Sequence, residues 1–140
     1  MTATIEFFFD FGSPTAYMAH TQLPGIAERT GATLVYRPIL LGGVFKAIGS
    51  TSPAAVPAKG AYMGRDIARS AVKLGVDYAF NPHFPVNTLA IMRGAVAAQH
   101  EGEFAPYLDA MYRAVWVDGR NMSEIEEIGA VLVAAGLDPA

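Results

Sequence analysis

The most constraining feature of this 140-residue chain is the stretch FFFDFGSPTAY, residues 7–17, where an aromatic run gives way to glycine, serine and proline. Residues 5–11 favour β-structure with little polar alternation, which predicts a strand covered on both faces, as in a parallel sheet. Gly12 ends that strand, Ser13 has the chemistry of a helix N-cap, and Pro14 fits the first helical position. We therefore expect a strand that passes directly into a helix, with a small hydroxyl at the junction.

A second strand after this helix predicts a βαβ unit. The helical spacing continues from Pro14 to a stop at Gly31, and Pro24 should kink or interrupt the helix. The segment TLVYR, residues 33–37, has the composition of a short strand. Because parallel strands joined through a helix cross over with a right hand, the first forty residues predict one right-handed βαβ unit.

The rest of the chain predicts helices. From Leu40 onward a stretch rich in Gly, Ser, Pro and Ala indicates a long loop with at most one helical turn, around residues 44–48. Asn87 has N-cap chemistry, and Ser123 with Glu126 has the spacing of a capping box. Further helices are expected over residues 60–74, 88–100, 104–117 and 123–136.

The carboxyl-terminal residues have the pattern of a helix start. Asp138 has N-cap chemistry and Pro139 suits the first helical position. The sequence therefore stops, at Ala140, where a helix would begin. A two-stranded sheet with one helix cannot cover both faces of its strands. We therefore expect further residues or another chain to complete the sheet.

Composition excludes several classes of function. The chain has no cysteine, which removes disulfide exchange, thiolate nucleophiles and cysteine-bound metals, and its three histidines lack metal-ligand spacing, so no metal is expected. A net charge of −3 with scattered basic residues argues against nucleic acid as a partner. The N-terminal apolar run is broken by Glu6 and Asp10, which argues against a signal peptide or membrane span and favours a cytoplasmic protein.

A set of motifs in matching order connects the chain to a known family. FDFGSPTAY, LLGGVFKAIGS, VPAKGAYM, FPVNTL and AVWVDGRNMSE together resemble the 2-hydroxychromene-2-carboxylate isomerases, relatives of kappa-class glutathione transferases in the DsbA-like thioredoxin superfamily. The resemblance implies an α/β fold: a thioredoxin-like βαβ over residues 1–41 and an all-helical insertion over residues 42–140. It also implies that the C-terminal ββα part of the thioredoxin fold is absent from this chain.

The resemblance also implies a reaction. Related disulfide oxidoreductases carry Cys-x-x-Cys at this helix N-terminus, whereas here the four residues are SPTA, so the thiol would be that of glutathione. Free amide groups and the helix dipole stabilise a nearby anion such as a thiolate. The implied activity is the glutathione-dependent interconversion of 2-hydroxychromene-2-carboxylate and trans-o-hydroxybenzylidenepyruvate in naphthalene-type degradation. Ser13 would be catalytic, positioning and ionising the glutathione thiol without becoming covalently modified.

The same resemblance assigns the glutathione site to four residues. Ser13 is either a plain N-cap or the partner of the sulfur, and Thr15 either lines the glutathione site or is a surface residue of the first turn. Ser50 stands where the family usually has asparagine, so the amide donor there is lost. Lys59 matches the kappa-class lysine that contacts glutathione, and a cation facing a carboxylate suits that role; otherwise it is a solvated lysine.

Three further residues are weighed as substrate contacts. Tyr17 lies one turn after Ser13 and either donates to the sulfur or packs in the interior. Lys46 could meet the substrate carboxylate, although it is displaced by one residue from the lysine of the naphthalene-pathway isomerases, where Phe45 stands here. Asn87 is a helix cap that could also line the cleft.

Two alternative functions stay open. A kappa-class-like glutathione transferase would use Ser13 and Lys59 equally well but would retain glutathione in its product. An inactive truncated thioredoxin-like domain would bind no glutathione. With the isomerase, the expected partners are a small aromatic substrate and a second copy of the chain in a homodimer, with no nucleic acid and no membrane.

Overall fold

The structure is a computed structural model that describes residues 2–139. Its contacts divide the chain into two compact units, one ending at Asp77 and the other beginning at Tyr78. No helix within residues 2–139 has both the length and the apolar character needed to cross a membrane.

The first unit contains a pair of parallel strands, β1 (Thr4–Phe9) and β2 (Thr33–Pro38). Thr4 lies opposite Thr33, and the register continues to Phe9 opposite Pro38. The two strands and the helix between them form the βαβ unit that the sequence predicts. β1 ends two residues earlier than expected, because the chain turns at Asp10, where the Ser13 amide donates to the Asp10 carbonyl oxygen at 3.0 Å.

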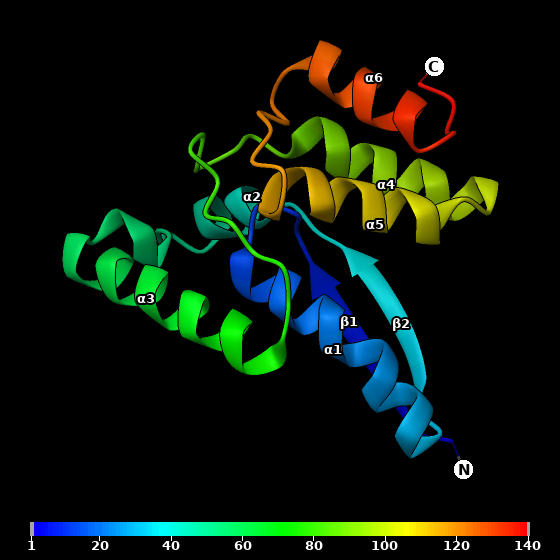
Figure 1. The fold of residues 1–140 in the computed structure, drawn as a ribbon, viewed down its shortest axis with the longest axis horizontal. Coiled ribbons are helices and arrows are strands. Elements are labelled where there is room, and N and C mark those ends of the chain that lie inside the picture. Colours follow the sequence, from blue (N-terminus) through cyan, green and yellow to red (C-terminus); the bar gives the residue numbers. More distant parts are fainter. Residues whose placement is uncertain (1, 140) are drawn as a thin grey trace. The chain divides into compact units, whose positions relative to one another are not determined.

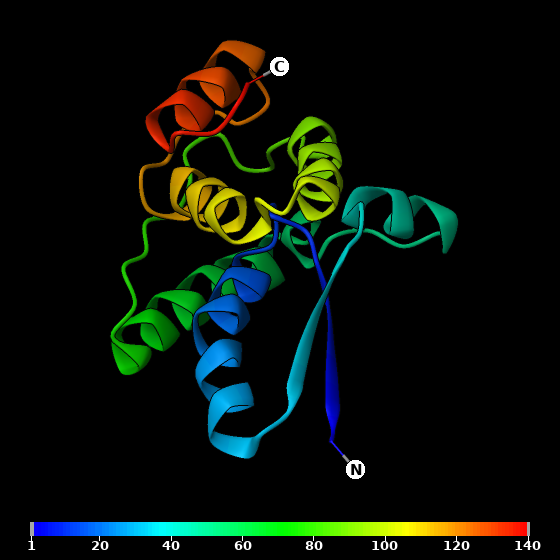
Figure 2. The same ribbon diagram turned by 90° about the vertical axis from the view of Figure 1, so that its right-hand side faces the viewer.

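Helix α1 (Pro14–Thr30) lies along one face of this strand pair (Figures 1 and 2). The rings of Phe7, Phe9 and Tyr36 pack together on the helix side, and His20 of α1 hydrogen-bonds the Tyr36 hydroxyl at 2.9 Å. The opposite face is exposed: Phe8 keeps 59% of its surface.

The helix is continuous through Pro24, so the interruption expected there does not occur. Pro24 and Gly25 lie on an exposed side of α1, and Pro24 removes one amide from the helix without ending it. The end of the helix agrees with the sequence: Gly31 adopts the left-handed conformation, with φ 69°, and its amide donates to the Glu28 carbonyl oxygen at 3.3 Å.

The segment after β2 has more helix than the sequence indicates. It contains α2 (Leu41–Ala47), a short 3₁₀ helix, η1 (Pro53–Ala55), and α3 (Pro57–Leu74). α3 begins three residues before the expected start because Pro57 occupies a first helical position. α3 packs against both η1 and α1, and this contact joins it to the first unit.

The second unit contains three helices in its described part: α4 (Leu89–Glu101), α5 (Phe104–Trp116) and α6 (Ile125–Ala134). α5 contacts both α4 and α6 (Figure 1). Its core is centred on Trp116 and Tyr112, which are 0% and 1% exposed. The boundary expected at residues 41/42 concerns where an insertion begins in the family's topology, and it stays a prediction beside the contact boundary at 77/78.

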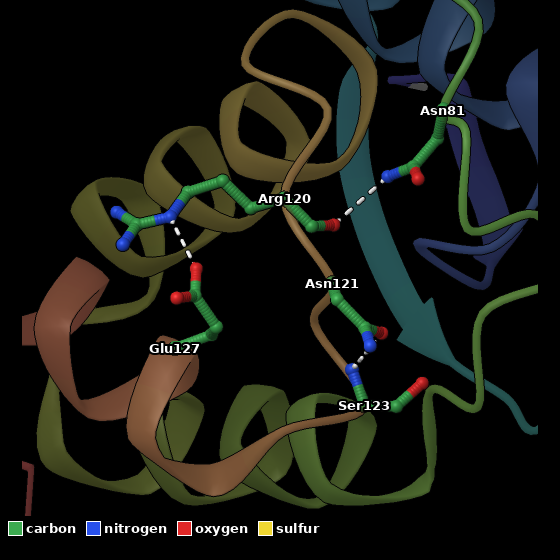
Figure 3. A network of polar contacts seen from close by, with 5 residues as sticks. All are labelled: Asn81, Arg120, Asn121, Ser123 and Glu127. Carbon is green, nitrogen blue, oxygen red and sulfur yellow. Dashed lines mark hydrogen bonds and ion pairs between the residues drawn. The ribbon is translucent and has the colours of Figure 1, made fainter.

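A polar network holds the connections of this second unit (Figure 3). The fully buried Asn81 donates to the carbonyl oxygens of Val115 and Arg120, each at 2.9 Å, and its Oδ1 accepts from the His83 amide. Arg120 in turn contacts Glu127 of α6 at 2.7 Å. Asn81 therefore fixes the loop before α4 to the end of α5.

The start of α6 corrects the expected capping box. The N-cap is Glu124, and it makes no side-chain cap hydrogen bond. Ser123 lies one residue too early for the cap position, and its Oγ accepts instead from the Asn87 amide at 3.0 Å. The helix start expected at Asp138 and Pro139 would continue through Ala140, which lies outside the described residues, and residues 137–139 themselves are not helical.

Candidate functional site: the turn between β1 and α1

The turn that carries Ser13 is built on Asp10. Asp10 is 4% exposed, and its Oδ1 accepts from the Gly12 amide at 2.9 Å while its carbonyl oxygen accepts from the Ser13 amide. A side chain that binds the amide two residues ahead is an Asx turn, which aspartate forms readily. The turn therefore fixes the backbone of Ser13 before the helix begins.

Ser13 is the N-cap of α1, as the sequence predicts. Its φ and ψ of −96° and 115° are extended, and its Oγ accepts from the Ala16 amide at 3.1 Å. The same Oγ lies 2.9 Å from Oγ1 of Thr15, and either hydroxyl can donate to the other. The two hydroxyls form a hydrogen-bonded pair at the amino end of the helix.

This arrangement leaves few donors for a ligand. The first helical residue, Pro14, has no N–H, and the Ala16 amide is taken by Ser13. Among the described residues, the Thr15 amide has no recorded acceptor. Because one proton of the hydroxyl pair is used between Ser13 and Thr15, one O–H stays available. One amide and one hydroxyl, beside the positive end of the helix dipole, can bind an anion.

Tyr17 lies on the same helix but its proton is used elsewhere. Its hydroxyl donates to the Asp77 carbonyl oxygen at 2.6 Å, and the side chain is 7% exposed. Of the two roles considered for Tyr17, the geometry fits packing in the interior. Its hydrogen bond joins α1 to the segment that follows α3.

Lys46 and Ser50 lie at and just after the end of α2. Both are exposed, and the Ser50 amide donates to the Phe45 carbonyl oxygen at 2.9 Å, while Gly49 between them has a φ of 66°. No hydrogen bond or ion pair recorded within residues 2–139 joins either side chain to Ser13. Both residues lie in the same unit as Ser13.

Lys59 lies in the first turn of α3 and lines an open groove of about 480 Å³ between η1 and α3. The groove wall is mostly apolar, with Pro53, Tyr62 and Met63, and Asp66 provides a carboxylate. No recorded hydrogen bond or ion pair in the described residues connects Lys59 to Ser13. The lysine is therefore an exposed cation that lines a mostly apolar groove.

Asn87 lies in the second unit, just before α4. Its Oδ1 accepts from the Leu89 amide at 3.1 Å, so it caps the first turn although the N-cap residue itself is Thr88. The predicted capping role is therefore observed one residue further from the helix. Within the residues searched, no three His, Asp or Glu side chains are grouped to hold a metal ion.

The residue that sequence reasoning missed is Asp10. In the sequence, Asp10 stands out only as a charge that breaks the apolar run. An acid two residues before a glycine and three before a serine cap is the pattern of an Asx turn, and this pattern could have identified it.

The fold and the site together define a class. A βαβ unit with hydroxyls at the amino end of its helix, in a chain without cysteine, is a thioredoxin-like α/β protein that lacks a redox dithiol. The chain belongs to the DSBA-like thioredoxin domain family, whose model matches residues 4–140. The family and fold class expected from the sequence motifs are thereby confirmed.

Within this family, the chain is similar in sequence to isomerases and glutathione transferases. The chain is 32% identical over 140 residues to a 2-hydroxychromene-2-carboxylate isomerase of Sphingobium xenophagum, an alignment covering 99% of this chain and 71% of that protein. It is 31% identical to the isomerase of Pseudomonas putida, across 82% of this chain and 57% of that one. Glutathione S-transferase kappa 1 of Caenorhabditis elegans is 27% identical across 95% of this chain and 62% of its own length.

Solved structures agree with these relatives. A structure of 2-hydroxychromene-2-carboxylate isomerase superposes with a TM-score of 0.79 at 28% identity, covering 97% of this chain and 67% of the other. A putative protein disulfide isomerase from Nitrosomonas europaea, 15% identical with a TM-score of 0.63 over 99% of this chain and 67% of the other, shares the fold. The chain thus spans between a little over half and about seven-tenths of the proteins it matches.

Proposed function

We propose that this chain carries the thiol-activating part of a glutathione-dependent isomerase that acts on 2-hydroxychromene-2-carboxylate. The observation that carries the proposal is the hydroxyl pair of Ser13 and Thr15 at the start of α1, in a chain without cysteine. The identity of 32% to an isomerase of that name over nearly the whole chain supports the substrate class.

The role of Ser13 follows from the proton count at the turn. Its Oγ already accepts from the Ala16 amide, so its own proton can point to a ligand when Thr15 donates to it. A thiol with an ordinary pKa near 8.5 is only a few per cent ionised at neutral pH. Lowering that pKa by about two units takes about 2.7 kcal/mol. A hydrogen bond to the charged sulfur supplies about 1.5–3 kcal/mol, and the helix dipole about 0.3–1 kcal/mol more.

The proposed reaction has no net redox change. The ring carbon–oxygen bond of the hemiketal first opens, and the hemiketal proton passes to the phenol oxygen, which leaves an α-keto acid with a cis double bond conjugated to its ketone. The thiolate then adds to the benzylic carbon of that double bond, the electron pair moves to the ketone oxygen as an enolate, and the former double bond rotates as a single bond. Elimination then breaks the carbon–sulfur bond, restores the double bond in the trans form and returns glutathione. Holding the sulfur and the double bond in attack geometry would supply much of the rate.

Lys59 and Lys46 are the proposed cations of the site. Lys59 would bind a carboxylate of glutathione, and Lys46 that of the aromatic substrate, because both ammonium groups are exposed and in the first unit. Ser50 would make a weaker glutathione contact than the asparagine usual in the family. The homodimer also stays a prediction.

The test is a time course of the chromene's ultraviolet spectrum with and without glutathione. We expect isomerisation only with glutathione, and a roughly 10- to 100-fold lower kcat/KM for Ser13→Ala, the equivalent of one charged hydrogen bond. Ser52→Ala is the matched control, because Ser52 Oγ likewise accepts from a backbone amide, that of Ala54, at the start of η1. Equal activity of Ser13→Ala and the wild-type chain would remove the serine from the mechanism.

A kappa-class-like glutathione transferase is the second candidate, favoured by the 27% identity to glutathione S-transferase kappa 1. The two reactions differ in what happens to the thiol. An isomerase leaves the amount of free glutathione unchanged at the end of the reaction, whereas a transferase consumes one glutathione per product. A thiol assay on the same time course separates them, and calorimetry that detects no glutathione binding would support an inert domain.

A further inference from the structure

Asp10 makes one more contact than its turn requires. Besides the Gly12 amide at 2.9 Å on Oδ1, its Oδ2 accepts from the Leu41 amide at 2.8 Å, thirty-one residues further along the chain. Leu41 is the first residue of α2. Burying a carboxylate is costly unless its oxygens accept hydrogen bonds. Asp10 is 4% exposed, and each of its two oxygens accepts one.

The second contact explains why this position is an acid. An Asx turn alone is served equally well by asparagine, which has one acceptor oxygen and a donor NH₂ group. Here the two backbone amides, which come from different segments, bind two separate oxygens, an arrangement that a carboxylate offers and asparagine, with its single oxygen, does not. The strand ladder ends just before this point, where the Ile39 amide donates to the Phe9 carbonyl oxygen at 3.0 Å. Beyond the end of the strand pair, the Asp10 side chain therefore supplies the next hydrogen bond between the two segments.

The two segments that Asp10 joins are both parts of the proposed site. One is the turn that carries Ser13. The other begins at Leu41 and leads through α2 to Lys46 and Ser50. Because α2 has only seven residues and none of them is buried, its position depends on such end contacts more than on packing.

We propose that Asp10 is a positioning residue that holds the α2 segment, and with it Lys46, in place relative to the Ser13 turn. The consequence for turnover rests on the proposed function, in which Ser13 serves the sulfur and Lys46 the aromatic acid. Loss of the contact should therefore weaken use of the aromatic substrate more than binding of glutathione, because Ser50, the glutathione residue of this segment, is proposed to make only a weak contact.

The first test is amide hydrogen exchange, which needs no ligand. Asp10→Asn offers only one acceptor oxygen, and we expect the Leu41 amide to exchange at least tenfold faster, with Met111 in the core of α5 as an unchanged reference. Glu28→Gln, an exposed acid of α1, is the matched control for charge loss. An unchanged Leu41 amide in a folded Asp10→Asn chain would overturn the proposal.

A second variant removes the donor instead of the acceptor. Leu41 is the first residue of a helix, where proline is tolerated, and Leu40 before it is extended, with φ −103° and ψ 97°, as a residue before proline prefers. Leu41→Pro therefore deletes the amide proton without disturbing the acid, and Leu41→Ala controls for the lost side chain. This pair keeps the proposal testable should Asp10→Asn fail to fold.

Kinetics then separate positioning from general stability. For Leu41→Pro and Asp10→Asn we expect KM for the chromene acid to rise about fivefold or more, while the glutathione Kd changes less than twofold. A parallel loss of both affinities, or an unchanged KM despite faster exchange at α2, would overturn the positioning role. Absence of glutathione binding in the wild-type chain would defeat the proposed function alone, because the exchange arm still reports on the Asp10 contact.

Discussion

Ser13 and Thr15 share one available proton, and this count governs what the turn can do. Ser13 Oγ accepts from the Ala16 amide and is paired with Thr15 Oγ1, so whichever hydroxyl donates within the pair leaves the other free to donate outward. The proposed site is therefore a hydrogen-bonded pair of hydroxyls rather than a single serine. Thr15 also supplies the backbone amide that has no recorded acceptor in the described chain.

Replacing the threonine tests the hydroxyl pair. Thr15→Val keeps the β-branched shape and the backbone amide but deletes the hydroxyl, so glutathione affinity should fall about fivefold, the equivalent of a hydrogen bond worth about 1 kcal/mol. Thr15→Ser keeps the hydroxyl and should bind like the wild-type chain. Titration calorimetry of the three proteins measures the difference, and a valine variant with wild-type affinity would show that Ser13 acts alone.

The residue scale also shows where sequence reasoning reaches its limit. Ser13 was predictable because the order Gly-Ser-Pro has a local physical meaning at a helix start. The second contact of Asp10 was not, because its partner Leu41 lies thirty-one residues away and only the register of two strands brings them together. Tyr17 shows the same limit, since nothing local in the sequence indicates a bond to Asp77.

At the scale of elements, the closest approach of α4 and α5 is set by Gly94. A Cβ added there would collide with the Tyr107 hydroxyl, which donates to the Ile91 carbonyl oxygen at 2.7 Å. Tyr107 is 6% exposed, and a shift of its ring away from Gly94 would stretch or break that hydrogen bond. The glycine is therefore required by packing between two helices.

Gly94→Ala should lower the free energy of unfolding by about 1–3 kcal/mol, as is usual for overpacking. Gly129→Ala is the control, because a Cβ at this position in α6 meets nothing within 4 Å. That substitution should raise stability by about 0.5–1 kcal/mol through the better helix propensity of alanine. Urea denaturation compares the two, and equal effects of both substitutions would contradict the packing assignment.

The same tyrosine gives the second unit a response to alkali. Burial raises the pKa of the Tyr107 hydroxyl above its ordinary value of about 10. At a pH between the ordinary pKa and the raised pKa, the unfolded chain loses a proton that the folded chain keeps. Stability is therefore full below about pH 10 and falls by about 1.4 kcal/mol per pH unit above it.

Tyr107→Phe should reduce that alkaline slope, at the cost of the hydrogen bond to Ile91, worth about 1 kcal/mol at neutral pH. Part of the slope should persist, because burial also raises the pKa of Tyr78. Denaturation curves at several alkaline pH values measure the slope, and an unchanged slope in the phenylalanine variant would show that another group titrates.

Helix ends were predictable where they depend on a local sequence pattern alone. The predictions were wrong where a tertiary contact competes with that pattern. Two glycines end helices as predicted: Gly31 after α1 and Gly75 after α3 both adopt the left-handed conformation. The capping box failed because the Ser123 hydroxyl binds the Asn87 amide from another part of the unit. The break expected at Pro24 does not occur because α1 lies against the strands and this packing holds the helix together through the proline.

At the scale of the whole molecule, the chain has two compact units of different character. The first contains the strands, the hydroxyl pair and the proposed cations, and the second is a helical unit fastened by the buried Asn81. The thioredoxin-like fold was predictable from motif order. Whether the residues of the second unit, Asn87 among them, contribute to the site was not, because that depends on contacts that no local pattern specifies.

The proposed function depends on one electrostatic property: the start of α1 would stabilise the thiolate of a bound glutathione. The ultraviolet absorbance of the thiolate, followed against pH with the tripeptide bound, tests it most directly. We predict a midpoint about two pH units below the ordinary thiol value near 8.5, and a return toward that value in Ser13→Ala but not in Ser52→Ala. A bound thiol that titrates like free glutathione in the wild-type chain would contradict the account.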